Sequence, residues 1–350
     1  MRVIYAKNVN DAFYTGINML KRHGVKQNSR AGYVLVMPTP VMTAYEKPQQ
    51  RVLFHSKRDA NPFFHLFEAL WMLAGRNDGT WLDQFVHDFS SRFAEEDGHV
   101  HGAYGFRWRK HFDMEGGGDS RLPDQLETIV RLLKANPDDR RVVLQMWDPV
   151  ADLGVDAKDI CCNTQAYFRI RSTQDNGVSR HPMLLDMTVC CRSNDAVWGA
   201  YGANAVHFSI LQEYLAARIG VGIGTYYQMS NNFHIYSDMV EKLGELESEG
   251  DYYHNQQVLP TPIVTAPDDF DAELQLFMGN HPIREKYDYK NKFFPEVAMP
   301  LLKANTLWKA KERDEALWNI QALPASSDWK MVVGQWTGRR MYKKTVGEVR

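Results

Sequence analysis

The chain has little cysteine and carries its few thiols in an unusual arrangement. Only four of its 350 residues are cysteine, in two adjacent pairs, Cys161-Cys162 and Cys190-Cys191. Four cysteines in so long a chain are no disulfide framework. Neither pair has the C-x-x-C spacing that is typical of zinc sites. The sequence therefore predicts reduced thiols and no metal.

Net charge and long apolar runs are also lacking. The 41 basic and 43 acidic residues nearly cancel, so no long-range field selects nucleic acid or an anionic membrane as partner. No window approaches 18 uninterrupted apolar residues, and residues 1–7 (MRVIYAK) lack the apolar stretch of a secretory signal. We therefore expect a cytoplasmic protein that binds small molecules, not nucleic acid or a membrane. Any anionic ligand must be held by local arginines.

The chain is long enough to bury a substantial core, and its periodicity predicts an α+β body. Asn61 is a good N-cap and Pro62 suits the first helical position, so a helix is expected from there to Gly75. Glu68 stands out inside this otherwise apolar helix. The other expected helices cover 124–135, 203–218 and 236–245, and the expected strands cover 141–147, 165–170, 183–191 and 225–229. Asn176-Gly177 predicts a hairpin turn between the second and third of these strands.

The character of the sequence changes near Pro260, where three prolines fall within eight residues. We expect a catalytic domain over 1–262, with a mixed β-sheet layered with helices. A helical C-terminal extension over 263–350 should pack on that body. Four tryptophans are its expected packing anchors: Trp308, Trp318, Trp329 and Trp336.

Cys162 and two arginine-containing segments are the first candidates for chemistry. Cys162 lies between a loop rich in aspartate and an expected strand, where a thiol can be exposed enough to react. Arg192-Ser193 can grip a phosphate through charged and neutral hydrogen bonds, and Arg140-Arg141 is a second candidate. Taken alone, each has a more ordinary interpretation, because most free cysteines are packing residues and most such arginines lie in solvated loops.

Together with other short blocks, these residues resemble the thymidylate synthases and their hydroxymethylase relatives. Seven blocks occur in the family's order at nearly the family's spacing, between about residues 20 and 245. They are E-A-L-W (68–71), H-G-A-Y-G-F-R-W (101–108), D-D-R-R (138–141), C-C-N (161–163), R-S-N-D (192–195), G-A-Y-G-A-N (199–204) and F-H-I-Y (233–236). Agreement of seven ordered blocks by chance is negligible. The resemblance implies the thymidylate synthase fold.

The resemblance also implies three catalytic residues. Cys162 would add to C6 of a pyrimidine ring and so make C5 nucleophilic toward the one-carbon unit of 5,10-methylenetetrahydrofolate. Glu68 would relay protons to the ring carbonyl and the folate through water. Tyr104 matches the tyrosine that helps to remove the proton from C5.

The implied phosphate site takes residues from two subunits. Arg192, Ser193 and Arg30 would hold the 5′-phosphate of the nucleotide. Arg140 and Arg141 match a pair that reaches this phosphate from the partner subunit, which implies an obligate homodimer.

Four further residues match positions that contact the sugar or the folate. His234 and Tyr236 would form hydrogen bonds with the 3′-hydroxyl of the sugar. Asp195 matches the aspartate that contacts the pterin ring, and Lys57 lies where the family grips the glutamate tail of the folate.

Three departures from a thymidylate synthase favour a hydroxymethylase of the kind that phages use to make modified DNA bases. Cys161-Cys162-Asn163 replaces the family's Pro-Cys-His. Ser90 stands fourteen residues before Tyr104, where synthases have a tryptophan that shields the methylene group at C5 from water. About eighty extra residues replace the short apolar tail of the synthases. An open pocket admits water, and water attack gives a hydroxymethyl group, whereas hydride transfer gives a methyl group.

The base and two alternative functions stay open at this point. Synthases recognise uracil with an asparagine, whereas cytosine-specific relatives use an aspartate. Asn204 is available here and no aspartate is, which favours dUMP over dCMP. The margin is small, because the spacing from Gly199 to Asn204 is one residue longer than usual. An ordinary thymidylate synthase is the nearest alternative, and a non-catalytic nucleotide-binding protein is a distant one. The former would release dihydrofolate.

Overall fold

One mixed β-sheet forms the centre of the computed structural model, which describes residues 1–29, 32–112, 124–173, 183–247, 251–255, 257–279 and 281–347. In this part of the chain the strands are β1 (Arg2–Ala6), β2 (Val25–Ser29), β3 (Gly32–Val36), β4 (Val41–Tyr45), β5 (Val143–Gln145), β6 (Asn163–Ser172), β7 (Met183–Asp195) and β8 (Gly222–Tyr236). The main order is β1-β4-β8-β7-β6-β5, with β3 beside β8 and β2 beside β3. β1 is parallel to β4 and β7 to β8, whereas the other pairs are antiparallel. The predicted α+β class with a mixed sheet is confirmed.

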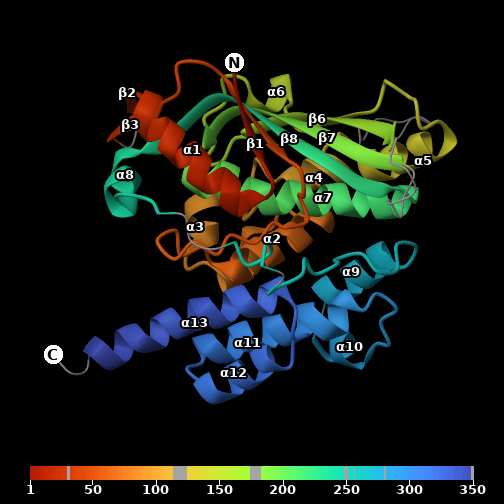
Figure 1. Cartoon of the computed structure of the whole chain (residues 1–350). Coiled ribbons are helices and arrows are strands. Elements are labelled where there is room, and N and C mark those ends of the chain that lie inside the picture. Colours follow the sequence, from red (N-terminus) through yellow and green to blue (C-terminus); the bar gives the residue numbers. More distant parts are fainter. Residues whose placement is uncertain are drawn as a thin grey trace.

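Helices cover one face of this sheet (Figure 1). The helices of the body are α1 (Val9–His23), α2 (Pro62–Leu73), α3 (Phe89–Phe93), α4 (Tyr104–Arg109), α5 (Gln125–Ala135), α6 (Pro149–Asp152), α7 (Asn204–Ile219) and α8 (Ser237–Leu243), with a 3₁₀ helix η1 (Gly79–Gln84) and a π-helical turn η2 (Ala196–Ala203). α1 and α7 lie against the sheet, and α2 packs on α7 from the side away from the strands. Because α7 is enclosed between sheet and helix, residues 204–216 are buried all round.

The α2 helix forms as its sequence predicts. The Asn61 side chain accepts a hydrogen bond from the N–H of Phe64 at 3.2 Å, and Pro62 occupies the first turn. Ten of the twelve helical residues are buried, and Glu68 is one of the two that are not. Gly75, with φ +68°, follows the helix end in the left-handed conformation that suits glycine.

Two strands differ in length from the prediction. The strand expected over 141–147 is only Val143–Gln145, because the N–H groups of Met146 and Trp147 both donate to the carbonyl of Thr164, which ends the regular ladder. The strand expected over 225–229 extends over Gly222–Tyr236, and the next helix begins after it. β6 and β7 pair as the predicted antiparallel hairpin. Its turn, with Asn176-Gly177, lies outside the described residues.

The C-terminal segment is helical and packs on α2. It contains α9 (Phe270–Met278), α10 (His281–Lys286), the π-helical turn η3 (Phe294–Ala298), α11 (Met299–Lys309), α12 (Arg313–Gln321) and α13 (Asp328–Gly347). Figure 1 shows these helices, in blue, on the side of α2 remote from the sheet. The Trp336 ring meets the Phe63 ring edge-on, with centroids 5.7 Å apart. Trp308 and Trp329 are also buried, but Trp318 is 69% exposed, so its prediction as a packing anchor is wrong.

Two sets of ionic contacts attach this segment to the body. Glu213 of α7 forms a buried ion pair with Arg51, and its other oxygen accepts the N–H of Ile263 at 2.6 Å. Asp59 accepts hydrogen bonds from Arg339 and Arg340 of α13. A domain boundary after residue 262 stays a prediction. None of the helices in the described ranges combines the length and the apolar character that a membrane span needs.

Candidate active site

Cys162 lies at the entrance to β6, where backbone contacts fix its position. Its N–H and that of Asn163 donate to the Tyr104 hydroxyl oxygen at 3.0 and 3.1 Å, and its carbonyl accepts the N–H of Arg192 at 2.8 Å. The predicted nucleophile, the tyrosine of α4 and the arginine of β7 therefore meet. Because the Tyr104 oxygen accepts both bonds, its own proton is free to point at a ligand.

The two adjacent thiols have different surroundings. Cys161 is buried, and burial raises the pKa of its thiol to about 12. Cys162 is only partly buried. Burial raises the pKa of the Cys162 thiol too, while the charge of Arg192 acts in the opposite direction. Cys162 is therefore the member of the pair that combines access with a stabilising cation.

Arg192 extends across the cysteine loop toward solvent. Its Nε donates to the carbonyl of Cys161 at 2.8 Å and its Nη2 to the carbonyl of Ile160 at 3.1 Å. These bonds hold the cation beside the Cys162 thiol and leave the third guanidinium nitrogen for a ligand. The Ser193 hydroxyl follows on β7 and makes no hydrogen bond with another described residue. Both groups are available to a ligand, and their role in holding a phosphate stays a prediction.

The other three predicted phosphate ligands do not join this pair within the described part of one chain. Arg140 and Arg141 are exposed, and Arg141 forms an ion pair with Asp139 at 2.7 Å while its side chain stays 84% exposed. Neither contacts Arg192 or Ser193. Arg30 lies outside the described residues.

Asn204 lies in a buried row of amides beside the cysteine loop. Its Oδ1 accepts from Asn163 at 3.0 Å, and its Nδ2 donates to Asn194 at 3.1 Å. Asn194 in turn donates to the Ser230 hydroxyl at 2.9 Å. In this arrangement the Asn204 amide directs Oδ1 toward Asn163 and Nδ2 toward Asn194.

The π-helical turn η2 explains the long spacing between Gly199 and Asn204. A π-helical turn accommodates one more residue than an α-helical turn, and such turns are frequent at functional sites. Gly202 has non-helical dihedral angles inside η2, where the turn joins α7. The wider turn absorbs the extra residue and still delivers Asn204 to the first position of α7.

Glu68 has a partner that the sequence did not reveal. His207 of α7 is buried, and its Nε2 lies 3.1 Å from Glu68 Oε2, although the two atoms are not aligned for a hydrogen bond. His207 follows Asn204 by three residues, so both side chains project from one face of α7. That spacing was the signal that could have identified it.

His234 and Asp195 are brought together by strand pairing. They are register partners on the adjacent parallel strands β8 and β7. Asp195 Oδ1 accepts the N–H groups of Val197 and Trp198, at 2.9 and 2.5 Å, at the start of η2. The Tyr236 ring lies 5.4 Å from the imidazole of His234, centroid to centroid.

The second carboxylate oxygen of Asp195 is buried and has no hydrogen-bond partner in the described chain. Burial raises the pKa of this carboxyl group. A buried oxygen without a donor is costly unless a ligand supplies one. The atom therefore suits a ligand with an N–H group, such as a pterin ring.

Lys57 and Ser90, the remaining predicted residues, have protein partners. The ammonium group of Lys57 donates to the carbonyls of Leu243 and Glu245 at 3.1 and 2.5 Å, where α8 ends. The Ser90 hydroxyl donates to Asp83 at 2.6 Å, and its N–H donates to the same carboxylate at 2.9 Å. These bonds hold Ser90 on the short helix α3.

Comparisons with known proteins show the family of the chain. The family model described as thymidylate synthase matches residues 11–271. The chain belongs to the thymidylate synthase family. It is similar to the deoxyuridylate hydroxymethyltransferase of Pseudomonas phage M6, with 41% identity over 97% of this chain and 95% of the relative. It is 34% identical to the deoxyuridylate hydroxymethyltransferase of Bacillus phage SP01, over 57% of this chain and 50% of the relative. It is 27% identical to a putative thymidylate synthase of Methanosarcina mazei, over 69% of this chain and 94% of the relative.

Membership of the thymidylate synthase family makes the chain a one-carbon transferase that uses methylenetetrahydrofolate. The unpaired oxygen of Asp195 fits this cosubstrate, because a pterin presents N–H donors to such an acceptor. Among the described residues, no group of three or more potential ligands could hold a metal ion.

Proposed function

We propose that the protein hydroxymethylates C5 of deoxyuridine 5′-monophosphate. Ser90 supports a hydroxymethyl product: by residue count it matches the position of the shielding tryptophan of synthases, and its short side chain, bonded to Asp83, would leave room for water. The names of the two phage relatives, deoxyuridylate hydroxymethyltransferase, support the same outcome.

The proposed chemistry begins with the Cys162 thiolate, which adds to C6 of the pyrimidine. Arg192 stabilises that thiolate through its charge and holds the 5′-phosphate together with Ser193. Methylenetetrahydrofolate supplies a one-carbon unit at the oxidation level of formaldehyde. The C5 proton passes to a water molecule beside Tyr104, and Glu68, beside His207, relays protons to the ring carbonyl.

The amide row supports uracil as the base. With one N–H and one lone pair of Asn204 engaged by Asn194 and Asn163, one N–H and one lone pair remain. These match the O4 acceptor and the N3–H donor of uracil. Cytosine presents the opposite pattern, so Asn204 would have to flip its amide to bind it. The flipped amide would direct Nδ2 at the donor of Asn163 and Oδ1 at the acceptor of Asn194. The site therefore favours dUMP over dCMP.

We also propose that the enzyme is a homodimer that acts in the cytoplasm. The sheet face opposite α1 and α7 exposes apolar side chains of several strands, among them Tyr5, Val143 and Tyr167. Such a face suits a second copy of the chain. Arg140 and Arg141 do not contact Arg192 in their own chain, and in such a dimer they would reach the phosphate bound by the partner subunit.

Mixed dimers test this arrangement. Cys162→Ala and Arg140→Ala homodimers should each be nearly inactive. After unfolding and refolding together in equal amounts, about half of the dimers are hybrids, and each hybrid has one intact site, which restores about a quarter of wild-type activity. No recovery, in a mixture that gel filtration shows to be dimeric, would contradict the donated arginine.

Product analysis tests the reaction. We expect dUMP with methylenetetrahydrofolate to yield 5-hydroxymethyl-dUMP by mass spectrometry, with no rise of dihydrofolate absorbance. dCMP supplied separately should react at least about tenfold more slowly, from one mismatched hydrogen bond. Dihydrofolate formed in step with nucleotide consumed would identify a thymidylate synthase instead, and binding of dUMP without turnover would identify a non-catalytic protein.

A further inference from the structure

Asp159 belongs to the loop that carries the proposed nucleophile Cys162, and its carboxylate has no hydrogen-bond donor among the described residues. It lies three residues before Cys162, partly buried, in the loop that joins α6 to β6. Its Oδ2 lies 2.7 Å from where a Cβ on Gly102 would be, so the carboxylate packs directly on that glycine. No described residue donates a hydrogen bond to either of its oxygens.

Asp152, the last residue of α6, is a nearby carboxylate with a structural role. It is buried and accepts hydrogen bonds from Arg107 at 2.9 Å and from the N–H of Asp148 at 2.8 Å, with His101 also 2.9 Å away. Asp159 has no such set of partners, so holding the loop in place does not account for it.

The charges around Asp159 come from every neighbouring element. They belong to Glu68 of α2, His101, Tyr104 and Arg107 on and before α4, Arg192 of β7, and Cys161 and Cys162 of its own loop. Burial and then the charge of Glu68 raise the pKa of Asp159 to about 6. A carboxylate of this kind can take up a proton near neutral pH, which ordinary aspartates cannot do.

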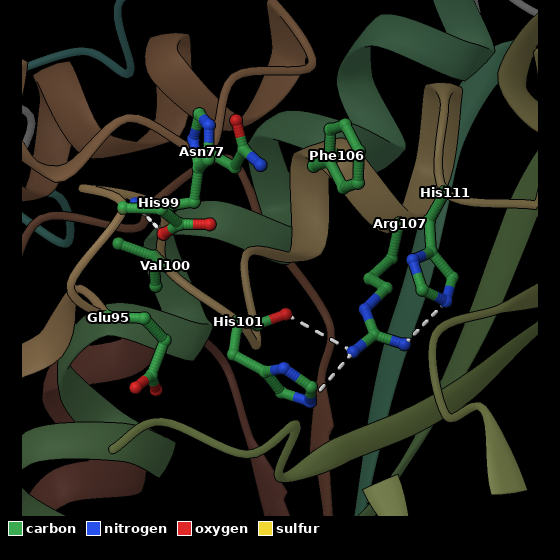
Figure 2. Close-up of a pocket in the computed structure, with 9 residues that line it drawn as sticks. Asn77, Glu95, His99, Val100, His101, Phe106, Arg107 and His111 are labelled. Carbon is green, nitrogen blue, oxygen red and sulfur yellow. Dashed lines mark hydrogen bonds between the residues drawn. The ribbon is translucent and has the colours of Figure 1, made fainter. Parts of the chain in front are cut away.

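A pocket of about 220 Å³ begins at His101, the residue before Gly102. Figure 2 shows His101 and His111 on either side of Arg107, joined to it by hydrogen bonds; Glu95 and Asn77 also line the pocket. His101 lines the pocket, and the next residue, Gly102, packs against Asp159. The pocket is large enough to hold water, and polar side chains such as Asn77, Glu95 and His99 on its lining can serve as hydrogen-bond partners for that water.

We propose that Asp159 is the general base for the water molecule that adds to the one-carbon unit at C5 of the nucleotide. The inference rests on the proposed hydroxymethylation. The water oxygen forms a bond to the methylene carbon, while its proton passes to Asp159 and the π pair of the methylene moves onto the C4 carbonyl. The pair then returns to form the 5,6 double bond, the bond from C6 to the Cys162 sulfur breaks, and a thiolate leaves. Atoms and electrons balance without an oxidant or a reductant.

This assignment gives Glu68 and Asp159 different proton transfers. Glu68 lies beside His207 and is proposed to serve the ring carbonyl. Asp159 lies three residues before Cys162, and its charge contributes to raising the pKa of the Cys162 thiol. Unlike environments for two neighbouring carboxyl groups are how one site supports two different proton transfers.

The test is Asp159→Asn, assayed with dUMP tritiated at C5 and methylenetetrahydrofolate. The rate of tritium release measures the reaction up to loss of the proton from C5. The rate at which the hydroxymethyl product forms also includes the addition of water to the methylene carbon. Loss of a general base should slow product formation by about 10²-fold to 10⁴-fold in single turnover. Release of tritium in the first turnover should change less than about threefold. Asp156→Asn, an exposed aspartate of the same loop, is the matched control and should change neither.

Two further measurements distinguish a base from a structural role. The acidic limb of the wild-type rate profile, near pH 6, should be absent in Asp159→Asn, and formate should restore part of the product formation in Asp159→Ala. Equal loss of tritium release and product, or unchanged product, would overturn the assignment. Failure of the proposed function itself looks different, because the wild-type enzyme would then produce dihydrofolate or no product at all.

Discussion

Replacing Asn204 with aspartate should reverse the choice of base. The carboxylate keeps an acceptor for Asn163 but has no N–H for Asn194 or for O4 of uracil. Asn194 can rotate its amide and offer Nδ2 to the new carboxylate, since the Ser230 hydroxyl can donate as well as accept. The buried network therefore survives, and the main loss falls on the uracil contact.

The size of the effect follows from that contact. A buried acceptor left without its donor costs about 1–3 kcal/mol, and the amino group of cytosine gains a comparable bond to the carboxylate. The preference between the bases should thus move by about 2–6 kcal/mol, or about 30-fold to 10⁴-fold in the ratio of kcat/KM values.

Competition between the two nucleotides measures this ratio directly. Equal amounts of dUMP and dCMP are incubated with limiting methylenetetrahydrofolate, and both products are quantified by mass spectrometry. Asn231→Asp, which places the same charge on an exposed position of β8, is the control and should keep the wild-type ratio. If Asn204→Asp lowers both rates equally, or leaves dUMP preferred as before, the amide does not read the base.

Three other perturbations have definite expected results. Cys162→Ala should lower turnover by at least about 10⁴-fold while equilibrium dialysis shows unchanged dUMP binding, whereas Cys161→Ala should stay active; the reverse would move the nucleophile to Cys161. Glu213→Ala should lower the free energy of unfolding in urea by about 3–5 kcal/mol, because it leaves a buried guanidinium unpaired; a loss below about 1 kcal/mol would contradict this. Burial raises the pKa of Asp59, but hydrogen bonds from two arginines outweigh it and lower this pKa overall. The ionised carboxylate should therefore contribute at most about 1 kcal/mol to the free energy of unfolding. This contribution is complete above about pH 4 and is lost as the pH falls through the lowered pKa of the folded state. Asp59→Asn should remove that acid dependence in thermal melts between pH 3 and 7.

Local sequence signals were sufficient for much of the fold. Asn61-Pro62 marked the start of α2, and the hydrophobic pattern located α5, α7 and the β6–β7 pair. These features depend on caps and periodicity, which act over a few residues. Strand lengths were less accurate, because the end of β5 depends on which carbonyl of β6 its neighbours reach.

The sequence by itself determined the family and the ordered set of polar residues that includes the predicted nucleophile Cys162, since these are matters of residue type and spacing. The tertiary structure decided what those residues do to one another. Strand pairing set Asp195 beside His234, η2 absorbed an extra residue so that Asn204 still reaches Asn163, and α7 brought His207 to Glu68. The environment of Asp159 also depends on α2, α4 and β7 together. Such contacts join segments up to about 140 residues apart. A local spacing can show which side chains share a helix face, as for Asn204 and His207, but not which distant residue they meet, because burial and charge depend on everything that packs around a side chain.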